Sequence, residues 1–333
     1  MASALSERLT DLPGHDQAAF DAIHERAEHL LRPSGALAWL DEIAAWVAGW
    51  QRTTSPAVDR PAALVFAADH GVAAATKVSA YPTGITEALF GAFDQGRSTI
   101  AAFARIAGAS VRAIDVGIGQ PTGDIRYEAA LSSERFDEIV ELAFEAVDAL
   151  DCDLLVLGEI GIGNTTPSAA IAAALAGGET AAWVGRGTGV DDEGLARKRK
   201  AVQESVRRIA GITDPLEILR EVGGSELVAI AAATVAARHR SIPVVLDGYV
   251  VTSAVLPLVM INPAALDHCT VGHCSTEPGH RKLLERLDKR PLLDLDMRLG
   301  EGSGAMAAVP LVKMACAGVV EVATFDEWFG TPD

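Results

Sequence analysis

Residues 154–166 read LLVLGEIGIGNTT, and this stretch decides the fold. It begins with four consecutive apolar residues, passes through a turn that holds three glycines, and runs into the helix-length segment 166–175. A short, continuously apolar strand that leads through a glycine turn into a helix is typical of a parallel sheet covered on both faces.

The same pattern recurs along the chain. Three more short apolar runs stop at a glycine or a carboxylate, namely residues 62–68, 111–116 and 243–246. The other helix-length segments are residues 86–106, 133–150, 192–209 and 225–238. This alternation predicts an α/β fold, a doubly wound (Rossmann-like) parallel sheet with helices on both faces. Ligands bind such sheets beyond the carboxyl ends of the strands, so we expect function in the glycine-rich turns.

Both chain ends are helical in pattern. Residues 16–31 and 36–50 carry apolar side chains at helical spacing, and residues 305–322 form a long apolar segment. We expect residues 1–58 and 305–333 to form a small helical domain together. Residues 59–304 would then form the large α/β domain that carries the active site.

The composition disfavours two classes of partner. The formal net charge is −17, whereas nucleic-acid-binding proteins usually carry a basic face. The opening MASALSERLT lacks a signal-peptide pattern, and no run of about 18 uninterrupted apolar residues occurs, the length that a membrane span needs. We therefore expect a cytoplasmic protein with no nucleic-acid and no membrane partner.

The cysteines do not predict a disulfide framework. They are few and irregularly spaced in a long chain, which favours thiols. Segment 268–280, HCTVGHCSTEPGH, holds two His-Cys pairs that suggest zinc, but a second ligand cluster at zinc-site spacing is missing. We expect no metal, and we expect Cys269 and Cys274 to be buried as small apolar residues.

The turn at residues 158–166 has two interpretations. Its glycines let the backbone approach a ligand closely, and the following helix start, with its free N–H groups, suits a phosphate or carboxylate. A tight turn with ordinary helix capping by Asn164, Thr165 and Thr166 explains the same residues. The turn is not a P-loop, because no lysine follows the last glycine.

A second glycine-rich turn, GRGTGVDDEG at residues 185–194, precedes the basic run RKRK at 197–200. It is either another backbone cradle for phosphate or a plain loop with a solvated helix face. The acidic pair Asp191-Asp192 suggests a metal–pyrophosphate site, but such a pair usually ends a hydrophobic strand, and here glycines precede it.

Two further features involve carboxylates. Glu301 is flanked by glycines in LGEGSG, residues 299–304, so it is accessible, and an apolar wall beside it would raise its pKa toward the range of a general base. A surface glutamate in a flexible loop is the alternative. Asp69-His70-Gly71 ends an apolar run and either positions a substrate hydroxyl or forms a structural pair.

Taken in order, these motifs resemble the nicotinate-nucleotide–dimethylbenzimidazole phosphoribosyltransferase family of cobalamin lower-ligand synthesis. The resemblance covers most of the chain and is more specific than any single glycine turn. The segments that carry it are residues 32–37, 67–72, 78–82, 158–166, 185–198, 221–224, 245–248, 277–280 and 298–304.

The resemblance implies a homodimer without a cofactor, the fold described above, and particular residues. Glu301 would be the general base that deprotonates the attacking imidazole nitrogen, with Glu159 and Lys198 around the ribotide. The other implied substrate-binding positions are Asp69, His70, Ser79, Tyr81, Gly161, Gly163, Asn164, Thr165, Thr166, Gly185, Arg186, Gly187, Gly189, Asp247, Gly302 and Ser303.

The implied reaction moves the phosphoribosyl group of nicotinate mononucleotide to a benzimidazole-type base, giving an α-ribotide and nicotinate. The leaving ring is a cationic pyridinium that departs as a neutral nitrogen, so the chemistry needs no metal. The protein must then align the two rings, remove one proton and stabilise an oxocarbenium-like transition state. Glu159 is one residue that could stabilise it.

The chain departs from the family pattern at three places. The segment after residue 118 is short and runs through Gln120 to Arg135, Thr83 replaces a longer polar residue, and Ser225 replaces a bulkier one. These changes leave the identity of the acceptor base open: dimethylbenzimidazole, benzimidazole, an adenine-type base or a phenol.

A non-catalytic ribotide- or base-binding relative is one alternative function. The turn at residues 117–119 suggests a dinucleotide-dependent oxidoreductase. It lacks the third glycine of the dinucleotide-binding motif and a helix start at the right spacing.

Overall fold

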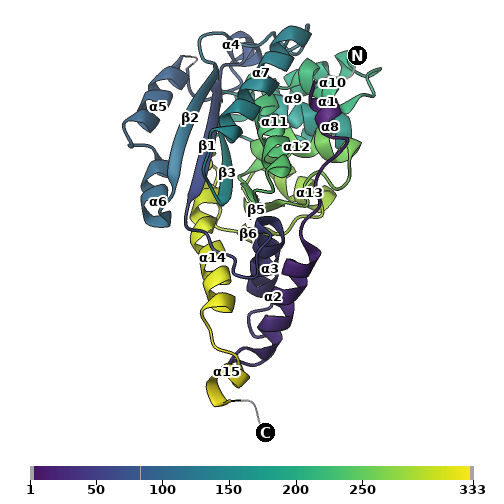
Figure 1. Ribbon diagram of the computed structural model, residues 1–333. Helices are drawn as coiled ribbons and strands as arrows, with labels where there is room; N and C mark the ends of the chain where they lie inside the picture. The colour runs from purple at the N-terminus through teal and green to yellow at the C-terminus, as the bar shows by residue number, and fades with distance from the viewer. Residues whose placement is uncertain (1–3, 83, 331–333) are drawn as a thin grey trace.

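The computed structural model describes residues 4–82 and 84–330, so Thr83 lies outside the described residues (Figure 1). One six-stranded sheet forms the centre, and all its strand pairs are parallel, in the order β2-β1-β3-β4-β5-β6. The strands are β1 (Pro61–Ala68), β2 (Ser110–Gly117), β3 (Leu154–Ile160), β4 (Val244–Leu246), β5 (Cys269–His273) and β6 (Pro291–Leu293).

Strand β1 shows why the sheet is covered on both faces. All eight of its residues are buried, and residues 62–68 alternate between two hydrophobic cores. Leu64 and Phe66 belong to the larger core, whereas Val65 belongs to the smaller one. A strand buried on both sides needs a continuously apolar sequence, which is the pattern that predicted the doubly wound sheet, and that prediction is confirmed.

The helices divide between the two cores. Residues of α1 (Ala4–Arg8), α4 (Gly71–Thr76), α7 (Ser133–Asp148), α8 (Thr165–Ala176), α9 (Asp192–Arg208), α10 (Pro215–Val222), α11 (Ser225–His239), α12 (Tyr249–Ile261) and α13 (Pro278–Arg286) enter the larger core. Residues of α2 (Gln17–His29), α3 (Trp39–Gln51), α5 (Ile85–Asp94), α6 (Thr99–Ala107) and α14 (Ser303–Val320) enter the smaller one. A 3₁₀ turn, Thr180–Trp183, and α15 (Phe325–Phe329) complete the described elements.

Two expectations from the sequence are wrong in detail, and two strands were missed. The single helix expected over residues 86–106 is two helices, because Gly96 has a left-handed φ of 63° and the Ser98 hydroxyl then caps α6 by accepting from Ala101 N at 3.3 Å. The helix expected from residue 36 begins only at Trp39. Strands β5 and β6 were not predicted, since both are short and interrupted by cysteine, histidine or proline.

Helices α2 and α3 lie beside α14 and α15 at the lower end of the molecule, whereas α1 lies at the upper end and contacts α7 and α11 (Figure 1). Helix α14 contacts α2 and α3, and Leu31 N donates to Ala323 O at 2.9 Å. The side chain of Arg26 binds Val319 O and Glu327. Helix α14 also packs against α6 and β5, so the boundaries of a separate helical domain stay a prediction.

By length and composition, α14 alone among the described helices is long and apolar enough to cross a membrane. It contacts α3, α6 and the sheet, and 56% of its residues are buried, which is the environment of a core helix. The four cysteines are free thiols, as predicted, and all four are buried.

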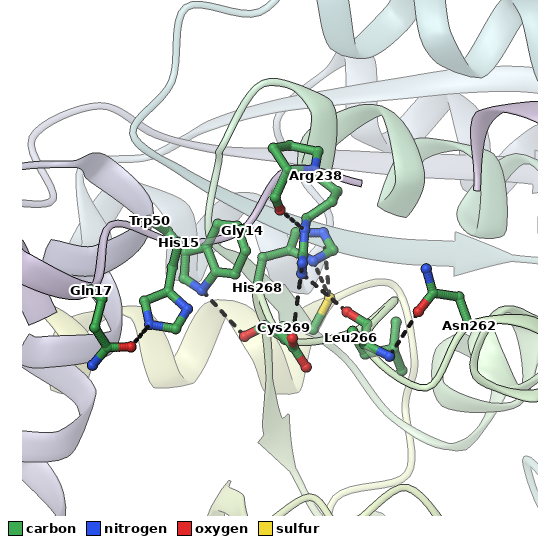
Figure 2. Close-up of polar contacts among 12 residues, drawn as sticks. Gly14, His15, Gln17, Trp50, Arg238, Asn262, Leu266, His268 and Cys269 are labelled. Atoms are coloured by element: carbon green, nitrogen blue, oxygen red, sulfur yellow. Dashed lines mark hydrogen bonds and ion pairs between the residues drawn. The ribbon is translucent and has the colours of Figure 1, made fainter. Parts of the chain in front are cut away.

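A polar cluster attaches α3 to the larger core (Figure 2). The ring of Trp50 lies 4.2 Å from the Arg238 guanidinium and 5.7 Å from the His268 ring. Its Nε1 donates to Asp267 O at 3.2 Å, and Arg238 donates to Pro13 O and Ala264 O. The N-terminal helices are therefore fixed to α11 and to the loop before β5.

Trp50→Ala tests this connection. Because Trp50 is 2% exposed, we expect the variant to lose about 3–5 kcal/mol of unfolding free energy in urea denaturation. The matched control is Trp328→Ala, since Trp328 is 66% exposed. Equal losses in the two variants would contradict this account of how the N-terminal helices are held.

Candidate active site

A cavity of about 560 Å³ lies beyond the carboxyl ends of β3, β4 and β5, where a doubly wound sheet binds ligands. Its floor includes Glu159 and the glycine turn after β3, and the turn before α14 closes one side. Apolar side chains form another wall, from Tyr81, Ile85, Leu89, Phe103, Met297 and Leu299. An apolar wall facing a polar floor suits a ligand with an aromatic ring and a charged group.

The glycine turn after β3 needs its glycines. A β-carbon at Gly161 would lie 2.8 Å from Glu226 Oε1 and 2.9 Å from His70 Nε2. Gly163 has a left-handed φ of 86°, and a β-carbon there would meet Ala73 at 2.8 Å. The turn therefore packs tightly on its supports and presents the start of α8 to the cavity.

Glu159 is the buried carboxyl group of the floor. It is 7% exposed, and Asn164 Nδ2 donates to its Oε2 at 2.5 Å. A β-carbon at Gly300 would lie 2.5 Å from its Oε1, so the turn before α14 covers it directly. Burial, followed by the charges of Asp247 and Glu226, raises the pKa of Glu159 well above its ordinary value. Burial and the neighbouring carboxylates thus favour its protonated form, and a cationic ligand would favour its ionised form.

Glu301 lies beside Glu159 on the turn before α14. Its backbone N–H donates to Glu159 O at 3.2 Å, and its φ of 66° is left-handed, an uncommon conformation for a residue other than glycine. Burial, and then the charge of Asp247, raises the pKa of Glu301 to about 7. Its Oε2 is buried without a hydrogen-bond partner among the described residues. A carboxylate with such a pKa is suited to remove a proton near neutral pH.

Lys198 lies on α9, behind Thr165 and Gly187 of the cavity lining. It is 1% exposed, and its Nζ donates to the hydroxyl of Thr165 at 2.8 Å. Burial lowers the pKa of Lys198 to about 8, and the nearby charge of Glu277 opposes this shift. A β-carbon at Gly187 would lie 3.1 Å from Nζ, so the second glycine turn passes directly over the ammonium group. The lysine, the α8 terminus and Gly187 together form a place for an anion.

Glu277 is a site residue to which the sequence analysis assigned no role. It lines the cavity, and its Oε1 accepts from Gly187 N at 2.8 Å, so it holds the second glycine turn. A β-carbon at Gly185 would lie 2.3 Å from its Oε2, which explains why residue 185 is a glycine. Its position after the unpredicted strand β5 hid it, although the segment 277–280 was part of the family resemblance.

The structure brings only part of the predicted set to the cavity wall. The predicted residues that line it are Tyr81, Glu159, Gly161, Asn164, Thr165, Gly187, Glu301 and Ser303. The predicted residues outside its lining are Asp69, His70, Ser79, Gly163, Thr166, Gly185, Arg186, Gly189, Lys198, Asp247 and Gly302. Apart from the apolar wall and Glu277, lining residues without a predicted role include His273, Ser275, Arg298 and Gly300.

Several residues outside the lining act as supports. His70 Nε2 lies 2.6 Å from Glu226 Oε1 with both side chains fully buried, which is the structural-pair alternative. Asp69 accepts from Thr86 Oγ1 at 2.6 Å and from Gly119 N at 2.9 Å. Arg186 binds Val190 O and Asp192 within its own loop.

The segment 268–280 does not converge on one point. His268 belongs to the Trp50 cluster, whereas His273 lines the cavity. Burial, as the main cause, lowers the pKa of His268 and His280 to about 3, so both are neutral. Within residues 4–82 and 84–330, no group of three or more His, Cys, Asp or Glu residues is arranged to hold a metal ion. Cys269 and Cys274 are buried, as expected.

The comparisons with known proteins agree with this geometry. A family model described as phosphoribosyltransferase matches residues 12–328. The nicotinate-nucleotide–dimethylbenzimidazole phosphoribosyltransferase of Mesorhizobium japonicum is 47% identical over 95% of this chain and 94% of its own length. The chain belongs to this family. The enzyme of the same name from Methylorubrum extorquens is 43% identical over 96% of the chain and 94% of its own length.

Solved structures of the family share the fold. The crystal structure of CobT from Thermus thermophilus superposes with a TM-score of 0.89 at 40% identity, and the match covers 95% of this chain and 100% of that one. Family membership and the α/β architecture are therefore established from both sequence and structure.

Proposed function

We propose that this chain transfers the phosphoribosyl group of nicotinate mononucleotide to a benzimidazole-type base, giving nicotinate and an α-ribotide for cobalamin lower-ligand synthesis. The observation that carries the proposal is Glu301, with a pKa of about 7, beside Glu159 and opposite an apolar wall in one cavity. Family membership supports the same reaction.

The anion place formed by Lys198, Thr165 and Gly187 suits the 5′-phosphate of the ribotide. Lys198 supplies the charge, and the N-terminus of α8 supplies backbone N–H donors. Among the described residues, Arg298 is the only Lys or Arg that lines the cavity itself. The phosphate would therefore be held mainly by Lys198 and the backbone N–H groups around it.

The carboxyl groups suit the reacting ring. The cationic pyridinium of nicotinate mononucleotide favours ionisation of a neighbouring acid, so binding of the ribotide lowers the raised pKa of Glu159. An ionised Glu159 then stabilises the positive charge that develops on the ribose as nicotinate leaves.

The apolar wall suits the acceptor base, stacked between Tyr81, Leu89 and Phe103. The unprotonated ring nitrogen attacks the anomeric carbon with its lone pair, from the face opposite to nicotinate. Glu301 therefore takes the proton from the other ring nitrogen and not, as the resemblance implied, from the attacking one. That direction of attack inverts the β-linkage of the ribotide to an α-linkage. None of residues 117–135 lines the cavity, so the short segment after Ile118 contributes no side chain to this wall.

The test is incubation of the purified protein with nicotinate mononucleotide and dimethylbenzimidazole, followed by chromatography and mass spectrometry. We expect stoichiometric nicotinate and α-ribazole phosphate. A panel of benzimidazole, adenine and a phenol identifies the preferred base. Binding of the ribotide without release of nicotinate for any base would favour the second candidate, a non-catalytic ribotide-binding relative. We further propose that the protein works in the cytoplasm and that it is a homodimer. Sedimentation of the purified protein would test the dimer.

A further inference from the structure

Asp247 is buried behind the cavity, not on its wall. It follows β4 and is 1% exposed. Its Oδ2 accepts from Gly302 N at 3.1 Å, and its Oδ1 accepts from Ala305 N at 2.8 Å. Both oxygens are thus used by backbone N–H groups at the start of α14, which would otherwise lack partners. The implied role of Asp247 as a substrate contact does not fit this position.

These contacts fix the turn that carries Glu301. On the side of β3, Glu301 N donates to Glu159 O. On the side of α14, Asp247 accepts from the backbone N–H groups of Gly302 and Ala305. A β-carbon at Gly158 would lie 2.5 Å from Gly302 N, so the turn lies flat on β3. A left-handed residue such as Glu301 persists only where its surroundings determine its conformation in this way.

We propose that Asp247 is the positioning residue that holds Glu301 in place to receive the proton of the acceptor base. The inference rests on the proposed function, because Glu301 is the general base of that proposed reaction. Asp247 does not touch the substrate and acts through the turn.

The charge of Asp247 acts on Glu301 as well. Burial raises the pKa of Asp247, but the His273 ring, 3.4 Å from Oδ1, and the two backbone N–H groups together lower it by more, so the group is ionised. After burial, that charge is the second cause of the raised pKa of Glu301. The other titratable groups around this turn are Glu159 of β3, Glu226 of α11, His273 of β5 and His280 of α13.

Asp247→Asn tests both effects. The amide has one acceptor in place of two and no charge, so the turn loses a hydrogen bond and Glu301 loses a repelling neighbour. We expect kcat to fall by about tenfold or more, the dissociation constant of nicotinate mononucleotide to stay within about threefold, and the acidic limb of the kcat/KM profile to move to lower pH.

A carbon-13 NMR titration of the Glu301 carboxyl group makes the test independent of activity. The resonance is assigned by its absence in Glu301→Gln, and we expect a lower pKa in Asp247→Asn than in the wild type. The matched control is Asp153→Asn, since Asp153 also accepts from two backbone N–H groups, at the opposite end of the sheet. The control should change neither kcat nor the titration of Glu301.

If Asp247→Asn fails to fold, Gly158→Ala addresses the same turn with Asp247 intact, because its β-carbon would displace residues 301 and 302. We expect kcat to fall there while ribotide affinity holds. The proposal is overturned if Glu301 titrates at the same pH in wild type and Asp247→Asn while kcat stays within about threefold. A wild-type protein without transferase activity would instead contradict the proposed function, and the NMR titration would still decide the role of Asp247.

Discussion

Glu301→Gln is expected to lower kcat by about 10²–10⁴-fold, the usual contribution of a positioned general base. Glutamine keeps the shape and the hydrogen-bonding length of the side chain but cannot accept the proton. Glu301 also lies where burial gives it a pKa of about 7, so at neutral pH a large fraction of the wild-type protein carries the active carboxylate. The measurement is steady-state release of nicotinate at saturating base.

Affinity separates this effect from damage to the site. We expect the dissociation constant of nicotinate mononucleotide to change by less than about threefold in Glu301→Gln, because the variant loses a transition-state interaction. Glu145→Gln is the matched control, since Glu145 is exposed on α7. Turnover near the wild-type rate in Glu301→Gln would remove Glu301 from the mechanism.

Lys198→Met is expected to weaken binding of nicotinate mononucleotide by about 10–100-fold, the range for loss of a hydrogen bond to a charged group. Methionine matches the length of the stem, so the space beneath Gly187 stays filled. Nicotinate riboside, which lacks the phosphate, should bind the wild type and the variant alike. Calorimetric titration with the two ligands measures both affinities.

The neighbouring Lys200→Met serves as the control, because Lys200 is largely exposed on the same helix. Because burial lowers the pKa of Lys198 to about 8, ribotide affinity of the wild type should also fall as pH rises through 8. Equal loss of affinity for the riboside and the ribotide in Lys198→Met would show that the lysine does not hold the phosphate.

The strand ends were predictable from sequence because each is a local pattern. An apolar run that stops at a glycine or a carboxylate depends on neighbouring residues only, and the turn after β3 lies where that pattern placed it. Strand β5 was not predictable in the same way, because CTVGH is short and its cysteine and histidine suggested a metal. Glu277 was missed with it.

Partners distant in sequence explain the other differences. His70 is paired with Glu226, 156 residues away, so its motif alone left open whether it positions a substrate hydroxyl or has a structural role. The carboxylate of Asp247 accepts from Ala305 N, 58 residues later, and no local pattern around Asp247 predicts that contact. The raised pKa of Glu301 was expected from an apolar wall, but the contribution of Asp247 required the fold.

The pH dependence of kcat/KM in wild type and Glu301→Gln tests the central claim most directly, that Glu301 is the base of this reaction. A group with a raised pKa of about 7 must lose its proton to act, so wild-type kcat/KM should fall as pH drops below 7. In Glu301→Gln, the residual activity should lose that acidic limb. A limb near pH 7 that survives unchanged in Glu301→Gln would contradict the account and assign the base to another group.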